Sequence, residues 1–179
     1  MGADNVPSFN ALDRHGSKKA DSLHQLLRQH GVDFAVGVPC GVIRHLIAHL
    51  DEDPGVRHLI ATRESEAVGI AAGAYFAGAT PVVYMQNSGL FAASNDIASL
   101  LIPYETPILF VVSYRGCENE DAVQHMTTGR STLSLLSSFQ LAYSVLEHQD
   151  LTEVVGSLLE HMQQSPAPVF LLLKRGWYR

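Results

Sequence analysis

The sequence predicts an α/β protein, a three-layer sandwich in which helices cover both faces of an open, mostly parallel sheet of six strands. Short apolar runs alternate along the chain with longer segments in which apolar residues recur at helical spacing. In addition, the runs at 108–112 and 169–173 are apolar at every position. Such runs are typical of parallel strands that are buried on both faces, and they therefore favour this fold class over a helical bundle or an antiparallel sheet.

The expected helices and strands follow from the apolar spacing and from the residues that begin and end each segment. Apolar residues repeat at helical spacing between Ser17, a residue type that caps helices, and Gly31, which ends them. The apolar run 34–38 then predicts a strand, and residues 42–50 return to helical spacing. The same unit recurs, with further strands expected at 57–61, 81–85, 107–113, 141–145 and 169–173, and further helices at 65–77, 95–102, 130–138 and 151–163.

Length and periodicity together define one domain. Residues 1–16 show no periodicity, so we expect a flexible leader there, followed by a single domain over 17–179. A chain of 179 residues can bury a sizeable core but is too short for two domains of ordinary size.

Composition excludes several classes of function. Twelve basic against 18 acidic residues give a net charge of −6, with no basic stripe that could track the phosphates of a nucleic acid. No apolar run approaches the roughly 20 residues of a membrane-spanning helix, so no membrane insertion is expected. Two cysteines, Cys40 and Cys117, form no disulfide framework, and the start of the chain lacks the apolar core of a signal peptide. The expected location is cytoplasmic.

Ligands of parallel sheets bind beyond the carboxyl ends of the strands, so the loops that follow strands are the candidate site. These loops are expected at 37–41, 62–66, 86–90 and 114–129. None carries a glycine-rich phosphate-binding signature, which disfavours a nucleotide-binding domain.

Glu64 is the first candidate, because it stands at a strand end directly before a helix rich in alanine and glycine. One reading is that Glu64 and Glu66 both decorate a helix N-terminus, where carboxylates are favourable by about 0.3–1 kcal/mol. The other reading is catalytic. The residues alone leave both readings open.

The whole phrase 63–75, followed after one strand by Asn87-Ser88-Gly89, resembles the pyrimidine-binding (PYR) domain of thiamine-diphosphate enzymes. The resemblance extends over most of 17–175. Within that superfamily the chain resembles the α-subunit type of sulfopyruvate and phosphonopyruvate decarboxylases. The motifs that carry this closer likeness are Val38-Pro39-Cys40, Arg63-Glu64, Met85 to Leu90, Arg115-Gly116 and Gln124-His125.

The resemblance implies a role for each matched residue. The glutamate matched by Glu64 hydrogen-bonds N1′ of the cofactor's aminopyrimidine and relays a proton, while Glu66 is expected to point elsewhere. Contacts with the cofactor are implied for Pro39, Asn87, Ser88 and Gly89 as well. His125 would bind an anionic substrate or transfer a proton, with Arg115 and Gln124 as further substrate contacts, although a solvated histidine and surface arginines are the competing readings. The chain departs from many relatives at Phe91, which would narrow the pocket.

The resemblance also implies that part of the active site, the pyrophosphate-binding part, is supplied by another domain. The family holds the diphosphate through Mg²⁺ on a pyrophosphate-binding (PP) domain with a Gly-Asp-Gly motif, which this sequence lacks. We therefore expect thiamine diphosphate as cofactor, no metal ligands on this chain, Mg²⁺ held by a separate PP-domain β subunit, and an α2β2 or larger assembly. The expected activity is that of a carboxy-lyase subunit acting on 3-phosphonopyruvate or 3-sulfopyruvate. The alternatives are a subunit of an acyloin-forming carboligase and a non-catalytic PYR-like regulatory subunit.

Overall fold

The computed structural model describes residues 17–117, 122–147 and 149–177. The expected leader, 1–16, lies outside the described residues. The helices are α1 (Ser17–Gln29), α2 (Arg44–Glu52), α3 (Glu64–Phe76), α4 (Asn87–Ala92), α5 (Ser94–Asp96), α6 (Val123–Ser138) and α7 (Leu151–Gln164), with a 3-10 turn η3 (Gly41–Ile43) and a π-helical turn η4 (Ile97–Leu101). The strands are β1 (Phe34–Gly37), β2 (Arg57–Ile60), β3 (Pro81–Gln86), β4 (Leu109–Tyr114), β5 (Ala142–Leu146) and β6 (Val169–Lys174).

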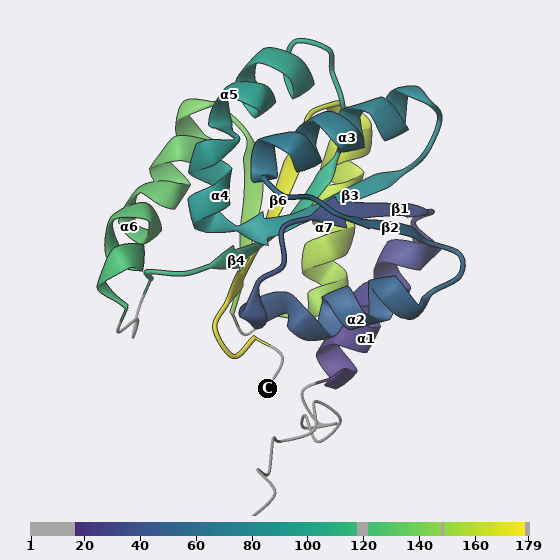
Figure 1. Ribbon diagram of the computed structural model, residues 1–179, viewed down its shortest axis with the longest axis horizontal. Coiled ribbons are helices and arrows are strands. Elements are labelled where there is room, and N and C mark those ends of the chain that lie inside the picture. The colour runs from purple at the N-terminus through teal and green to yellow at the C-terminus, as the bar shows by residue number, and fades with distance from the viewer. Residues whose placement is uncertain (1–16, 118–121, 148, 178–179) are drawn as a thin grey trace, which may run out of the picture.

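The six strands form one sheet in the order β2-β1-β3-β4-β6-β5, and every neighbouring pair is parallel. Helices α1, α2 and α7 cover one face of the sheet, whereas α3, α4, α5 and α6 cover the other (Figure 1). The predicted three-layer α/β sandwich is thus confirmed.

The apolar runs that predicted the sheet form its centre. All six residues of β4 are buried, and the side chains of Phe110 and Phe170 stack with ring centroids 4.6 Å apart between β4 and β6. By contrast β2 lies at the edge, where Leu59 and Ile60 remain 41% and 64% exposed. No helix among the described residues is long and apolar enough to cross a membrane.

Three predictions of local structure were wrong. The segment 86–90 was expected to be a loop, but α4 begins at Asn87, directly after β3, and the helix expected at 95–102 is divided between α5 and η4. The helix expected at 130–138 begins at Val123, so that His125 lies in its first turn. The segment before α6 comes very close to it: a Cβ on Gly116 (φ 74°) would lie 1.8 Å from the carbonyl oxygen of His125. Glycine at this position lets the two backbones meet.

The strand order places the site. The chain passes from β1 outwards to β2 and then returns to β3 on the other side of β1. The connections after β1 and β3 therefore diverge, which leaves a crevice beyond the carboxyl ends of these strands.

Candidate functional site

A cleft of about 330 Å³ opens at this crevice between the ends of β1 and β3. Its walls come from the connection after β1, from the start of α3, from the end of β3 and from the end of β4. The lining residues are Val38, Pro39, Cys40, Gly41, Glu64, Gln86, Ser88 and Arg115. Residues far apart in the sequence thus meet where the topology predicts a ligand.

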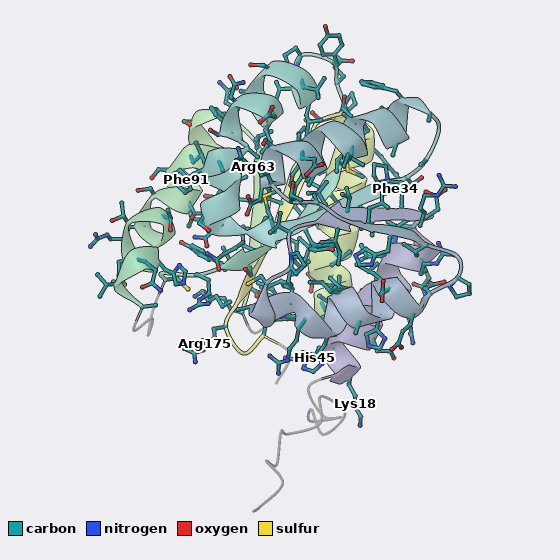
Figure 2. The ribbon with its side chains drawn as sticks, in the orientation of Figure 1. Lys18, Phe34, His45, Arg63, Phe91 and Arg175 are labelled. Carbon is teal, nitrogen blue, oxygen red and sulfur yellow. The ribbon has the colours of Figure 1, made fainter. Side chains whose placement is uncertain are left out.

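Glu64 is the carboxylate of the cleft. It is the first residue of α3, directly after Arg63, which Figure 2 labels at the start of that helix. Its side chain is half-buried and lies against Gly89 of α4: a Cβ built on Gly89 would be 2.2 Å from Cγ of Glu64 and 2.3 Å from its Oε1. Carbon atoms in contact are about 3.5–4.0 Å apart, so the present position of the Glu64 side chain requires glycine at 89.

Glu66 lies elsewhere, as expected. Its Oε2 accepts hydrogen bonds from the hydroxyl of Thr62 at 2.6 Å and from the Thr62 backbone N–H at 2.8 Å. These bonds, first that of the hydroxyl, lower the pKa of the Glu66 carboxyl. An interaction of this kind fixes the entry into a helix. The two carboxylates of the motif therefore have different positions. Glu64 lines the cleft, whereas Glu66 is exposed outside it and is hydrogen-bonded to Thr62.

Gln86 joins the walls of the cleft. Its Nε2 donates to the hydroxyl of Ser88 at 2.7 Å and lies 3.4 Å from Nδ1 of His125, while its Oε1 accepts from the thiol of Cys40 at 3.7 Å. The hydroxyl of Ser113 in turn donates to the Cys40 sulfur at 3.1 Å. Gln86 and Cys40 both fall in the loops expected to form the site, but neither was assigned a role there. The available signal was position, because Gln86 ends a buried strand directly before the Asn87-Ser88-Gly89 motif.

The predicted substrate residues lie at different distances from the cleft. Arg115 lines it directly, and His125 reaches its margin through Gln86. Gln124 is exposed on the first turn of α6 and is not among the lining residues. Phe91, labelled in Figure 2 on α4, is not among them either. Arg130 of α6 lies away from the cleft and lines another cavity of about 540 Å³ together with Glu147 and Lys174.

Asn87 does not line the cleft but holds together the elements that surround it. Its fully buried side chain donates through Nδ2 to the carbonyl of Arg115 and to the hydroxyl of Thr132, both at 2.9 Å, and its Oδ1 accepts from the N–H of Arg115 at 3.1 Å. These bonds tie the start of α4 to the end of β4 and to α6. The expected contact of Asn87 with a cofactor stays a prediction, and in this geometry only its main chain could make it.

The side chains that line the cleft suit an organic ligand that carries ring nitrogen atoms and anionic oxygen atoms. Glu64 offers a carboxyl group, Arg115 a guanidinium group, and Val38 and Pro39 apolar surface. Among residues 17–117, 122–147 and 149–177, no group of three histidine, cysteine, aspartate or glutamate side chains is placed to hold a metal ion.

Comparison with known families finds one match over most of the domain. The model described as "Thiamine pyrophosphate enzyme, N-terminal TPP binding domain" matches residues 17–135. Glu64, Gln86, Ser88 and Arg115 all fall within these bounds.

Individual relatives agree with this family. The chain is 35% identical over 155 residues to "Sulfopyruvate decarboxylase subunit alpha" of Methanothermobacter thermautotrophicus, covering 86% of this chain and 94% of the relative. It is 38% identical over 117 residues to "Phosphonopyruvate decarboxylase" of Streptomyces viridochromogenes, which covers 65% of this chain but only 30% of that protein. Among solved structures, 2-oxoglutarate:ferredoxin oxidoreductase from Magnetococcus marinus has a TM-score of 0.62 at 19% identity, over 89% of this chain and 29% of that one. At this identity the structural likeness concerns the fold alone.

Proposed function

The chain belongs to the family of thiamine pyrophosphate enzymes, as an N-terminal TPP-binding domain, and we propose that it is the α subunit of a thiamine-diphosphate-dependent 2-oxo acid decarboxylase. The proposed substrates are 3-sulfopyruvate and 3-phosphonopyruvate. The position of Glu64 in the cleft, against Gly89, is the observation that carries the proposal. A non-catalytic subunit would have no need of a carboxylate held in this way.

The cleft fits the aminopyrimidine part of the cofactor in size and chemistry. A volume of about 330 Å³ accommodates a planar ring, and Val38 and Pro39 supply the apolar surface that such a ring needs. Glu64 supplies a carboxyl that can hold or give up a proton next to a ring nitrogen. We propose Pro39, Glu64, Ser88 and Gly89 as the cofactor contacts of this chain, with Asn87 holding their frame. Bound thiamine diphosphate supplies the electron sink for the decarboxylation.

The other residues act on the substrate. Arg115 is proposed to bind the sulfonate, phosphonate or carboxylate group, because a guanidinium matches the oxygen atoms of such anions in pairs. His125, at the margin of the cleft, is proposed to hold or transfer a proton. Gln124 would contact the substrate only if the exposed first turn of α6 faces a second chain in the assembly.

A partner chain is the remaining part of the proposal. Relatives are named as "subunit alpha", and the match to the longer phosphonopyruvate decarboxylase covers 30% of that protein. We propose that a PP-domain β subunit supplies the Mg²⁺ and diphosphate ligands in an α2β2 or larger assembly. The isolated chain is then expected to bind thiamine diphosphate weakly and to release no CO₂ from either substrate. Robust turnover by the purified chain alone would contradict the two-chain arrangement.

The decisive test compares two carboxylates of one motif. In the assembled complex, Glu64→Gln keeps size and polarity but removes the acid, and a general acid–base group contributes about 10²–10⁴-fold in rate. We expect CO₂ release and proton exchange at C2 of the cofactor to fall at least about a hundredfold. The control, Glu66→Gln, removes a carboxylate outside the cleft and is expected to lose far less. Equal activity of the Glu64→Gln and unmodified complexes would refute the catalytic assignment, and product analysis with an added aldehyde would reveal a carboligase.

A further inference from the structure

Gln86 makes contacts that no other described residue of the cleft combines. It is the last residue of β3 and lies half-buried between the connection after β1 and the first turn of α6. Its single amide group contacts the thiol of Cys40, the hydroxyl of Ser88 and the Nδ1 atom of His125. The amide therefore links one lining residue on each side of the cleft to the histidine at its margin.

The chemistry of these partners fixes which way the amide points. The hydroxyl of Ser113 donates to the Cys40 sulfur, which leaves the thiol hydrogen to point towards an acceptor. The amide oxygen of Gln86 is that acceptor, since an amide N–H₂ group only donates. The N–H₂ group then faces Ser88 and His125, with one hydrogen for each.

The orientation of the Gln86 amide determines which nitrogen of the His125 ring carries the proton. A donor that faces Nδ1 requires Nδ1 to be the acceptor, and a neutral imidazole carries its one proton on the other nitrogen. We propose that Gln86 is a positioning residue that holds neutral His125 as the Nε2–H tautomer, with Nδ1 turned inwards to the amide and Nε2–H left to serve a ligand. The inference rests on the proposed function only for what the Nε2–H group would do there.

Charged and titratable side chains near Gln86 also affect the His125 ring, so the experiment must take them into account. On the cleft side the titratable and charged groups of the described lining are Cys40, Glu64 and Arg115. Of these, Cys40 joins the network through Gln86 itself. Gln86→Glu replaces the donating amide nitrogen by an accepting oxygen without changing shape and also adds a negative charge, so the neutral variant Gln86→Met is needed beside it.

The experiment reads the tautomer directly. The full chain is labelled with ¹⁵N, and the ring nitrogens of His125 are observed by long-range ¹H–¹⁵N correlation at about pH 8, where an ordinary imidazole is neutral. A His125→Gln sample identifies the signals. The variants are Gln86→Glu, whose carboxylate has the same shape but can only accept, and the control Gln163→Glu, which makes the same change on the exposed side of α7.

Unmodified protein and the Gln163→Glu control are expected to carry the proton on Nε2, with Nδ1 unprotonated. In Gln86→Glu, Nδ1 is expected to become protonated, because it now faces a carboxylate. Gln86→Met is measured beside Gln86→Glu and serves alone if Gln86→Glu does not fold, as judged from its amide spectrum. In that variant both ring nitrogens are expected to shift towards each other as the two tautomers mix.

An Nδ1–H tautomer in the unmodified chain would overturn the proposal, as would an unchanged ring in Gln86→Glu or in Gln86→Met. The activity of the assembled complex is a separate measurement. Absence of decarboxylation would reject the proposed function while leaving the tautomer assignment intact.

Discussion

Replacing Gly89 by alanine places a methyl group where the Glu64 side chain now lies. A Cβ at position 89 would be 2.2 Å from Cγ, 2.3 Å from Oε1 and 2.4 Å from Cδ of Glu64. All three distances are far below van der Waals contact, so either α4 or the glutamate must move. A control with the same change is available at Gly156 in α7, where a Cβ would meet nothing within 4 Å.

The expected magnitude combines two opposing terms. Glycine to alanine within a helix stabilises by about 1 kcal/mol, and this term is shared by both positions. At Gly89, overpacking opposes it by about 1–3 kcal/mol. Gly89→Ala is therefore expected to be about 2 kcal/mol less stable than Gly156→Ala, which for a domain of this size lowers the melting temperature by about 4–8 °C relative to that control.

A double-mutant cycle assigns the difference to Glu64. Glu64→Ala removes the three atoms that clash, so Gly89→Ala made in that background should be as benign as Gly156→Ala. Free energies of unfolding of the single and double variants, measured by denaturant titration, give the coupling between positions 64 and 89. A coupling near zero, or equal stability of Gly89→Ala and Gly156→Ala, would refute the close approach on which the position of Glu64 rests.

Two further predictions concern the frame of the site. Burial raises the pKa of Tyr84 to about 12, and its hydroxyl lies 2.7 Å from Nε2 of His58. Because the folded state keeps this proton longer than the unfolded chain, whose tyrosine has a pKa near 10, the stabilisation is complete below pH 10 and is lost as the pH rises towards 12. Thermal unfolding of Tyr84→Phe should accordingly depend less on pH in that window than unfolding of the unmodified chain, and parallel profiles would contradict this assignment. Asn87→Ala removes three hydrogen bonds, two of them to the main chain of Arg115, and should lose about 3 kcal/mol at about 1 kcal/mol each. Thr132→Val removes two, the bond from Asn87 and the bond that the hydroxyl donates to the Thr128 carbonyl, and should lose about 2 kcal/mol. Denaturant titration measures both, and equal losses would show that the bonds to Arg115 contribute little.

The sheet could be predicted because its signal is local. Runs that are apolar at every position admit few structures other than a strand covered on both faces, and β4 and β6 are such strands. The same is true of Glu64, since a carboxylate directly after a predicted strand lies at the ligand-binding edge of any parallel sheet. Only the order of the strands, which no local pattern contains, had to come from the structure.

The helices beside the cleft could not be predicted in the same way. Asn, Ser and Gly at 87–89 are residues of turns by local preference, and yet they start α4. The buried amide of Asn87 finds its partners in Arg115 and Thr132, 28 and 45 residues away, and Gly89 allows the contact with Glu64. The polar start of α6 depends in the same way on the close approach of Gly116 to His125. Tertiary contacts of this kind override local preference and leave no periodic pattern in the sequence.

The walls of the cleft come from four separate parts of the chain, at or after the ends of β1, β2, β3 and β4, and this division explains why spacing alone located only part of the site. The reversal of strand order at β1 and β3 separates the backbone after these strands, and Glu64 enters the gap from the connection after β2. The carboxylate and the amide of Gln86 thus stand on adjoining elements whose relative position is fixed by the sheet and by the Gly89 contact, not by loops. A group that must hold a proton beside a ligand needs a rigid neighbour to fix its orientation, and the last residue of a buried strand is such a neighbour. In a sheet of this topology, the polar residue that ends a strand next to the reversal therefore merits the same attention as the motif that follows it.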